Sequence, residues 1–170
     1  MSNEQTDAVS QTEPPKEGEP APDFALKTHM GNTPVRLADF KNKQTVVLYF
    51  YPKDDTPGCT TESCAFRDLS DDFAEAGAVI LGVSLDDTDS HQKFADKFKL
   101  PFPLLADTDN KVASAYGVYK EKNLYGRKSM GIERTTFVIG RDGNVAKVYP
   151  RVKVDQHADE VLAFVREYAG

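Results

Sequence analysis

Two apolar runs, at residues 45–51 and 78–84, constrain the fold of this chain more than any other feature. Both are almost continuous and rich in β-branched and aromatic residues, Thr-Val-Val-Leu-Tyr-Phe-Tyr and Ala-Val-Ile-Leu-Gly-Val-Ser. Strands with this pattern are buried on both faces, as in a sheet that helices cover on either side. Between the two runs, residues 57–76 have a helical pattern that Gly77 ends. A strand, a helix and a second strand in this order predict an α/β unit.

The remaining segments extend this unit into one larger sheet. Gly31-Asn32 predicts a turn between two short strands within residues 24–40, and Asp142-Gly143 predicts a second hairpin turn near the C-terminus. The other elements are expected at residues 88–98 (helix), 104–105 (strand), 110–116 (helix), 134–139 and 145–149 (strands) and 155–168 (helix). The order β-β-β-α-β-α-β-α-β-β-α predicts an α/β sandwich, and its final hairpin makes the sheet mixed.

The N-terminal segment differs in composition from the rest of the chain. It is rich in Ser, Thr, Gln, Glu and Pro, carries five acidic residues against Lys16, and has no hydrophobic periodicity. Such a segment buries too little apolar surface to order itself. We therefore expect an acidic, disordered tail at residues 1–19 and a single domain at residues 20–170.

Charge and hydropathy exclude several classes of partner. The formal net charge is -6, most of the excess lies in the tail, and no basic stripe interrupts the remainder. Neither nucleic acid nor an anionic membrane is therefore an expected partner. The chain has no apolar stretch long enough to cross a bilayer, and it does not begin with the basic and apolar segments of an export signal. We expect a cytoplasmic protein.

The chain has two cysteines, Cys59 and Cys64. Two are too few for a framework of stabilising disulfides, so a pair this close indicates redox chemistry or metal binding. A zinc site needs further ligands at local spacing, and His29, His91 and His157 are isolated in the sequence. The spacing Cys-x₄-Cys also differs from the Cys-x-x-Cys of thioredoxin-like dithiols. We expect no metal and no cofactor.

Cys59 falls at the start of the helix predicted at residues 57–76. Thr56 is a suitable N-cap and Pro57 suits the first helical position, which places Cys59 third in the first turn. The Thr56 hydroxyl is expected to accept a hydrogen bond from the Cys59 amide. The free N–H groups and the positive end of the helix dipole favour an anion there. A thiolate at Cys59 is thus stabilised, as a nucleophile requires.

The spacing of the two cysteines leaves two alternatives. Five helical steps put the Cα atoms of Cys59 and Cys64 about 8.7 Å apart. A disulfide requires less than about 7 Å. Either the pair never forms a disulfide, or the first part of the helix unwinds when it does.

The loop before the helix resembles a known active-site motif. Pro52-x-x-x-Thr56-x-x-Cys59 is similar to the peroxiredoxin motif. The longer string at residues 51–68, Tyr-Pro-Lys-Asp-Asp-Thr-Pro-Gly-Cys-Thr-Thr-Glu-Ser-Cys-Ala-Phe-Arg-Asp, resembles the bacterioferritin-comigratory (PrxQ) subfamily. The resemblance extends from about residue 18 to the C-terminus and includes Gly-Ile-Glu-Arg-Thr-Thr-Phe-Val-Ile at residues 131–139. It implies a thioredoxin-like three-layer sandwich with a central mixed sheet and an N-terminal β-hairpin.

The same resemblance implies a function and a role for each site residue. The expected activity is reduction of hydrogen peroxide and organic hydroperoxides by a monomer that receives electrons from thioredoxin. The implied roles are Cys59 as peroxidatic nucleophile, Cys64 as resolving thiol, Thr56 as a hydrogen-bond partner of peroxide and sulfur, Arg134 as the cation that polarises the peroxide, Pro52 as a shield against water, and Glu62 as the residue that positions Arg134.

Other interpretations of the same residues remain open at this point. Lys53, Asp54 and Asp55 are interpreted as solvated loop charges, and without the motif Arg134 would be a surface arginine at a strand end. A general disulfide reductase on the same fold is disfavoured because Cys-x-x-Cys is missing. A non-catalytic redox sensor or chaperone would share both the cysteine pair and the local unwinding.

Overall fold

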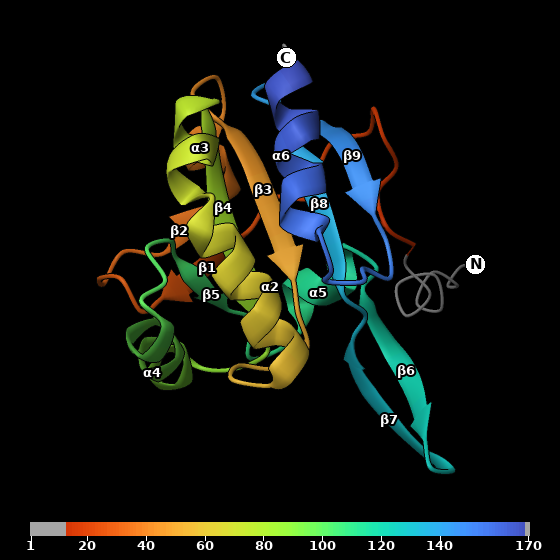
Figure 1. Cartoon of the computed structure of the whole chain (residues 1–170). Helices are drawn as coiled ribbons and strands as arrows, with labels where there is room; N and C mark the ends of the chain where they lie inside the picture. Colours follow the sequence, from red (N-terminus) through yellow and green to blue (C-terminus); the bar gives the residue numbers. More distant parts are fainter. Residues whose placement is uncertain (1–12, 169–170) are drawn as a thin grey trace, which may run out of the picture.

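The computed structural model describes residues 13–168, and a seven-stranded sheet forms its centre in the order β2-β1-β5-β4-β3-β8-β9 (Figure 1). Strand β3 pairs in parallel with β4 and antiparallel with β8, so the predicted mixed sheet is confirmed. The predicted N-terminal hairpin is also confirmed, since β1 and β2 pair antiparallel. The strands are β1 Ala25–Thr28, β2 Val35–Arg36, β3 Thr45–Phe50, β4 Ala78–Ser84, β5 Leu104–Ala106, β8 Thr135–Ile139 and β9 Val145–Tyr149.

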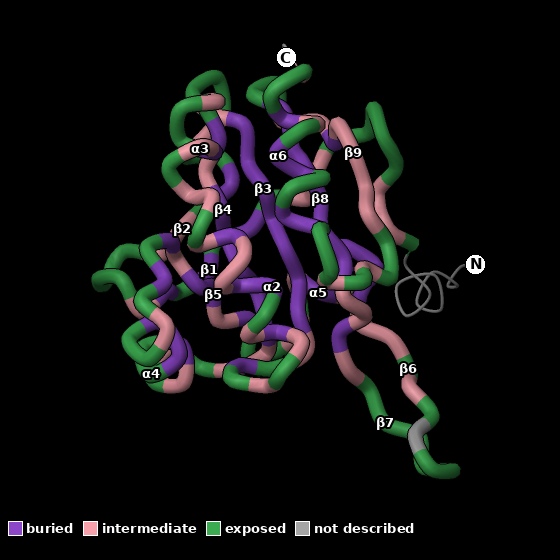
Figure 2. The backbone as a smooth tube through the Cα atoms, in the orientation of Figure 1, coloured by how far each residue is buried: buried purple, intermediate pink, exposed green. Residues whose placement is uncertain are grey.

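Strand β3 is buried on both faces, as its continuous apolar run predicts (Figure 2). Because side chains alternate across a strand, Val47 and Tyr49 enter one hydrophobic cluster, while Leu48 and Phe50 enter the other. Tyr49 stacks on Phe66 with ring centroids 4.8 Å apart, which fixes the helix after β3 against the sheet. The strand thus anchors the loop that leads to Cys59.

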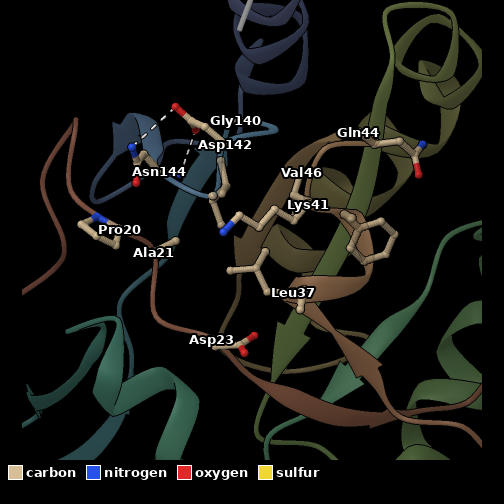
Figure 3. Close-up of a pocket in the computed structure, with 14 residues that line it drawn as sticks. Pro20, Ala21, Asp23, Leu37, Lys41, Gln44, Val46, Gly140, Asp142 and Asn144 are labelled. Atoms are coloured by element: carbon tan, nitrogen blue, oxygen red, sulfur yellow. Dashed lines mark hydrogen bonds between the residues drawn. The ribbon is translucent and has the colours of Figure 1, made fainter.

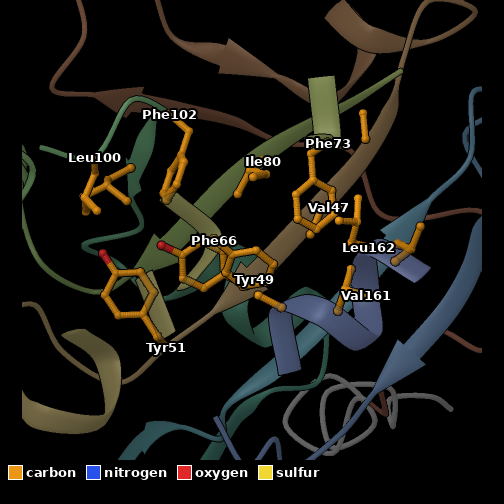
Figure 4. Close-up of a cluster of buried hydrophobic side chains, with 14 of the residues drawn as sticks. Val47, Tyr49, Tyr51, Phe66, Phe73, Ile80, Leu100, Phe102, Val161 and Leu162 are labelled. Carbon is orange, nitrogen blue, oxygen red and sulfur yellow. The ribbon is translucent and has the colours of Figure 1, made fainter. Parts of the chain in front are cut away.

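Helices cover both faces of the sheet and complete the three-layer thioredoxin-like sandwich predicted from the resemblance. Apolar side chains of α2, α3, α4 and α6 pack into the cluster of Figure 4, whereas the 3₁₀ helix η1 and α5 contribute to the opposite cluster. The helices are η1 Leu37–Phe40, α2 Pro57–Asp68, α3 Ser70–Glu75, α4 Thr88–Phe98, α5 Lys111–Ala115 and α6 His157–Glu167. The bounds of α4 coincide with the predicted helix at residues 88–98.

The prediction of one helix over residues 57–76 is wrong in one respect. Two helices, α2 and α3, meet at Leu69, whose φ of -105° and ψ of 8° leave the helical region. Ser70, Asp71 and Asp72 follow directly. These residue types are unfavourable inside a helix but favourable in its first turn, where Asp also complements the helix dipole. The sequence at residues 70–72 therefore starts a new helix.

A hairpin formed by β6 (Tyr119–Leu124) and β7 (Arg127–Ile132) is absent from the predicted order of elements. It projects from the domain, and most of its residues are exposed (Figures 1 and 2). Its strands are polar, so they have no alternating apolar pattern that would predict them. The loop between them is Tyr125-Gly126, with φ of 54° and 78°. Positive φ at both positions is the geometry of a two-residue type I′ hairpin loop.

The expected disordered tail at residues 1–19 falls partly outside the described residues, since positions 1–12 are not among them. The rest of that segment lies against the domain. The Gly18 amide donates to the Val145 carbonyl at 2.8 Å, and the Val145 amide donates to the Glu19 carbonyl at 2.8 Å. These bonds extend the edge of the sheet at β9. The expectation of disorder is therefore wrong for Gly18 and Glu19, because backbone pairing orders a polar segment without apolar burial, and for the rest of residues 1–19 it stays a prediction.

Candidate active site

Cys59 lies where its sequence context predicts, in the first turn of α2 directly after the loop that follows β3. Pro57 occupies the first helical position and Thr56 the N-cap. The Cys59 side chain is oriented inward, and the residue is only 1% exposed. The residue thus lies at the end of α2 that carries the free amides, and it is shielded from bulk water.

The half-buried Arg134 and the buried Glu62 complete a cluster around the sulfur. Arg134 Nη2 donates to Cys59 Sγ at 3.3 Å, and Arg134 Nη1 donates to Glu62 Oε1 at 2.6 Å. Arg134 directly precedes β8, which pairs with β3, so the sheet brings together residues that are 75 positions apart. Gly58 provides the space, because a Cβ at that position would lie 3.2 Å from Arg134 Nη2. The structure thus brings three of the predicted site residues together.

Burial and the neighbouring charges have opposite effects on the pKa values of Glu62 and Arg134. Glu62 is 1% exposed, and burial raises the pKa of its carboxyl to about 7, although the charge and hydrogen bond of Arg134 act in the opposite direction. Its second oxygen, Oε2, has no hydrogen-bond partner among residues 13–168. Burial acts to lower the pKa of Arg134, but Glu62 and Cys59 outweigh it and raise that pKa. Arg134 therefore remains a cation, held between a carboxyl group and a sulfur.

The predicted hydrogen bond from the Cys59 amide to the Thr56 hydroxyl is wrong. Thr56 has the extended backbone of an N-cap, with φ of -102° and ψ of 157°, but its Oγ1 donates to the Lys53 carbonyl at 2.9 Å instead. Its carbonyl accepts the Thr60 amide at 2.8 Å, the first bond of the helix. The hydroxyl therefore closes the turn before α2, because a side-chain hydroxyl can donate to a nearby loop carbonyl instead of capping the helix.

Cys64 is half-buried further along α2, and both cysteines are free thiols. The helix is continuous from Pro57 to Asp68, so the Cα atoms of Cys59 and Cys64 keep the helical separation of about 8.7 Å. A disulfide between them is out of reach in this conformation. Pro52 is half-buried at the start of the loop, directly after the buried Tyr51.

Sequence reasoning missed two residues near this cluster. Asp54 is 8% exposed, so its interpretation as a solvated loop charge is wrong, whereas Lys53 and Asp55 are exposed as expected. The signal for Asp54 was its position after a buried strand, where a carboxylate can accept from a neighbouring helix. Lys122 of β6 is half-buried, and burial together with the charge of Arg134 lowers its pKa. It was missed because the hairpin was missed.

In the part of the chain that the structure describes, neither a metal centre nor the hollow at the far end of the sheet competes with this site. Within residues 13–168, no group of three or more His, Cys, Asp or Glu side chains is arranged to hold a metal ion. A cavity of about 360 Å³ lies at the other end of the sheet (Figure 3). Val46 at the start of β3 lines it together with Lys41, Asp23 and the Gly140–Asn144 turn. Cys59 follows the opposite end of that strand. In the same described range, no helix is both long enough and apolar enough to span a bilayer.

The family model, the similar sequences and the similar solved structures all point to the same family of proteins. Residues 18–148 match the family described as AhpC/TSA. The chain is 50% identical to peroxiredoxin Bcp of Bacillus subtilis over 150 residues, which is 88% of this chain and 94% of that protein. Among solved structures, it resembles the bacterioferritin comigratory protein of Xanthomonas campestris, studied for alkyl peroxide reduction, with a TM-score of 0.82, 44% identity and coverage of 87% and 92%. The PrxQ of Xylella fastidiosa gives a TM-score of 0.85 at 39% identity, with coverage of 92% and 98%.

Proposed function

Since this chain belongs to the AhpC/TSA family and, within it, to the Bcp (PrxQ) peroxiredoxins, which are thiol peroxidases, we propose that Cys59 is its peroxidatic cysteine. The observation that supports this role most directly is the hydrogen bond from Arg134 Nη2 to Cys59 Sγ at 3.3 Å. It places a fixed cation against a buried sulfur at a helix N-terminus. Cys64 lies in the middle of α2, and within residues 13–168 no cation donates a hydrogen bond to its sulfur.

In the first step, the Cys59 thiolate attacks the terminal oxygen of a hydroperoxide. The S–O bond forms as the O–O bond breaks, so the sulfur is oxidised by two electrons to a sulfenic acid and the peroxide is reduced. The departing alkoxide or hydroxide takes the proton that the Cys59 thiol gave up, and leaves as an alcohol or water. Negative charge moves from sulfur to oxygen along one line, and Arg134 stabilises it there.

In the second step, we propose that Cys64 resolves the sulfenic acid. Its sulfur attacks that of Cys59, the S–S bond forms, the S–O bond breaks, and the hydroxide takes the Cys64 proton and leaves as water. The helical separation of about 8.7 Å between the Cα atoms forbids this step while α2 is intact. The first turns of α2 must therefore unwind. A dithiol protein of the thioredoxin type then reduces the disulfide by exchange and retains a disulfide of its own.

The remaining roles follow from the position of each residue. We propose that Thr56 contacts the peroxide from the loop and that Pro52 limits the access of water to it. Glu62 orients Arg134 through the bond of 2.6 Å. The substrates are hydrogen peroxide and organic hydroperoxides, and the Xanthomonas campestris relative is described for alkyl peroxide reduction. We further propose that the protein acts as a monomer in the cytoplasm and requires neither a metal nor a cofactor.

The test is peroxide consumption with thioredoxin, its reductase and NADPH. We expect Cys59→Ser to abolish turnover, and Cys64→Ser to complete one fast oxidation and then stop at the sulfenic acid. Intact mass of the Cys64→Ser product identifies that acid. Full turnover by Cys59→Ser would refute the proposed role. Reduction of disulfide substrates without peroxide would instead favour a general disulfide reductase.

A further inference from the structure

Asp54 is a buried carboxylate in the loop between β3 and α2, five residues before Cys59. Three side chains donate to it: the Tyr51 hydroxyl at 2.5 Å, the Ser90 hydroxyl at 2.8 Å and His91 Nδ1, which lies 2.7 Å from Oδ2. The Asp54 amide in turn donates to Asp86 Oδ2 at 2.8 Å. Both its side chain and its backbone are therefore fixed in one place.

The main partner of Asp54 is His91, which is fully buried in α4. His91 Nε2 lies 2.9 Å from the Leu105 carbonyl, which can only accept, so Nε2 carries a proton. Nδ1 faces Asp54 Oδ2 at 2.7 Å. The ring is thus held at both ends, by the loop on one side and by β5 on the other. Removing either contact leaves a buried polar atom without its partner, which costs more than the bond itself contributes.

This pair ties the loop to elements that do not take part in the proposed unwinding. α4 and β5 pack together, and neither contains a cysteine. From the tether, the chain continues through the turn closed by Thr56 Oγ1 and the Lys53 carbonyl, and reaches the first helical residue, Pro57. The position of the helix start is thus set from outside the helix. Releasing the loop would let the N-cap leave its extended geometry, which frays the first turn of α2.

We propose that the Asp54–His91 pair is a positioning unit that holds the start of α2 in the peroxide-reactive geometry, and thereby sets the balance between that form and the unwound form that closes the disulfide. The inference rests on the roles proposed above for Cys59 and Cys64. Loss of the pair slows oxidation of Cys59 and speeds closure of the disulfide. A pair that only stabilised the fold would change neither rate in the folded protein.

The experiment compares His91→Gln and Asp54→Asn with the wild type. Asp55→Asn is the matched control, because Asp55 is the next residue and makes an exposed ion pair with Lys97 at 2.8 Å, which contributes little. Competition kinetics gives the rate of Cys59 oxidation by hydrogen peroxide. Quenched samples analysed by intact mass give the rate of disulfide closure and the sulfinic acid formed per turnover at high peroxide.

We expect oxidation to slow in both variants by up to about tenfold, which is the shift that loss of one charge-assisted hydrogen bond produces in the equilibrium between the folded and unwound forms. Closure should accelerate severalfold, so that less sulfinic acid forms per turnover, while Asp55→Asn stays within about twofold of the wild type. The proposal would be overturned if neither rate changed in the two variants. It would also be overturned if the rates of oxidation and of disulfide closure decreased by the same factor.

One further variant and one control on the wild type complete the experiment. If His91→Gln does not fold, Ser90→Ala removes a single donor to Asp54 from the same helix, and it should move both rates in the same directions by about two- to threefold. No change in that variant would also reject the inference. A wild type that forms no sulfenic acid on Cys59 would reject the proposed function itself, which separates the two failures.

Discussion

Replacing Glu62 with glutamine should change how the stability of the protein depends on pH. In the wild type, Glu62 is buried with one oxygen bonded to Arg134 and the other without a partner among the described residues. Its carboxyl has a pKa of about 7 in the folded protein, against an ordinary value of 4.5. Glutamine keeps an oxygen for Arg134 but has no proton to release.

The sign of the effect follows from proton binding. Between about pH 4.5 and pH 7, the folded protein retains the Glu62 proton that the unfolded chain has already lost, so stability decreases as the pH rises through this window. A shift of this size corresponds to about 3 kcal/mol in total, of which about 2 kcal/mol falls between roughly pH 5.5 and pH 8. The advantage of Glu62→Gln over the wild type should therefore grow by about 2 kcal/mol across that range.

Urea unfolding of the reduced proteins, followed by circular dichroism at several pH values, measures this difference. Glu75→Gln is the control, because Glu75 is an exposed carboxylate near the end of the next helix, α3. Its stability curve should run parallel to that of the wild type. If the Glu62→Gln curve were also parallel, the proton would not be held in the folded state and the reasoning would be refuted.

Three further outcomes follow from the same structure. Arg134→Ala should slow the reaction with peroxide by about 10²–10³. It should also lower stability because Glu62 loses its partner, and adding Glu62→Gln should restore the stability but not the rate, measured by urea unfolding and stopped flow. Oxidation to the disulfide should accelerate amide exchange at residues 57–68 while β3 and β8 stay protected; equal protection in both forms would contradict the unwinding. A chain starting at Pro20 should lose about 1–2 kcal/mol of unfolding free energy, with unchanged peroxide reactivity.

The sequence predicted the site better than its surroundings. The apolar runs at residues 45–51 and 78–84 and the helix signals around Pro57 place Cys59 correctly, because burial and capping leave strong local patterns. Arg134 and Glu62 were predicted through the resemblance alone, since nothing local connects residues that are 72 positions apart.

The failures share a physical cause, which is polar residues whose partners lie elsewhere in the chain. Asp54 is one of three consecutive charged residues, and its buried hydrogen bonds to Tyr51, Ser90 and His91 distinguish it from the exposed Lys53 and Asp55. The β6–β7 hairpin is stabilised by backbone pairing between polar strands, which hydrophobic periodicity cannot reveal. Gly18 is ordered by the edge of β9 in the same way.

The sequence separation of Cys59 and Arg134 also has a consequence for the newly synthesised chain. At roughly 5–20 residues per second, the 75 residues between them take the ribosome roughly 4–15 s. During that interval β3 has no β8 to pair with, and the thiol has no guanidinium beside it. The Cys59 thiol of the nascent protein thus lacks its hydrogen-bond partner, and the cluster of Cys59, Arg134 and Glu62 forms only when the last strands of the sheet have been made.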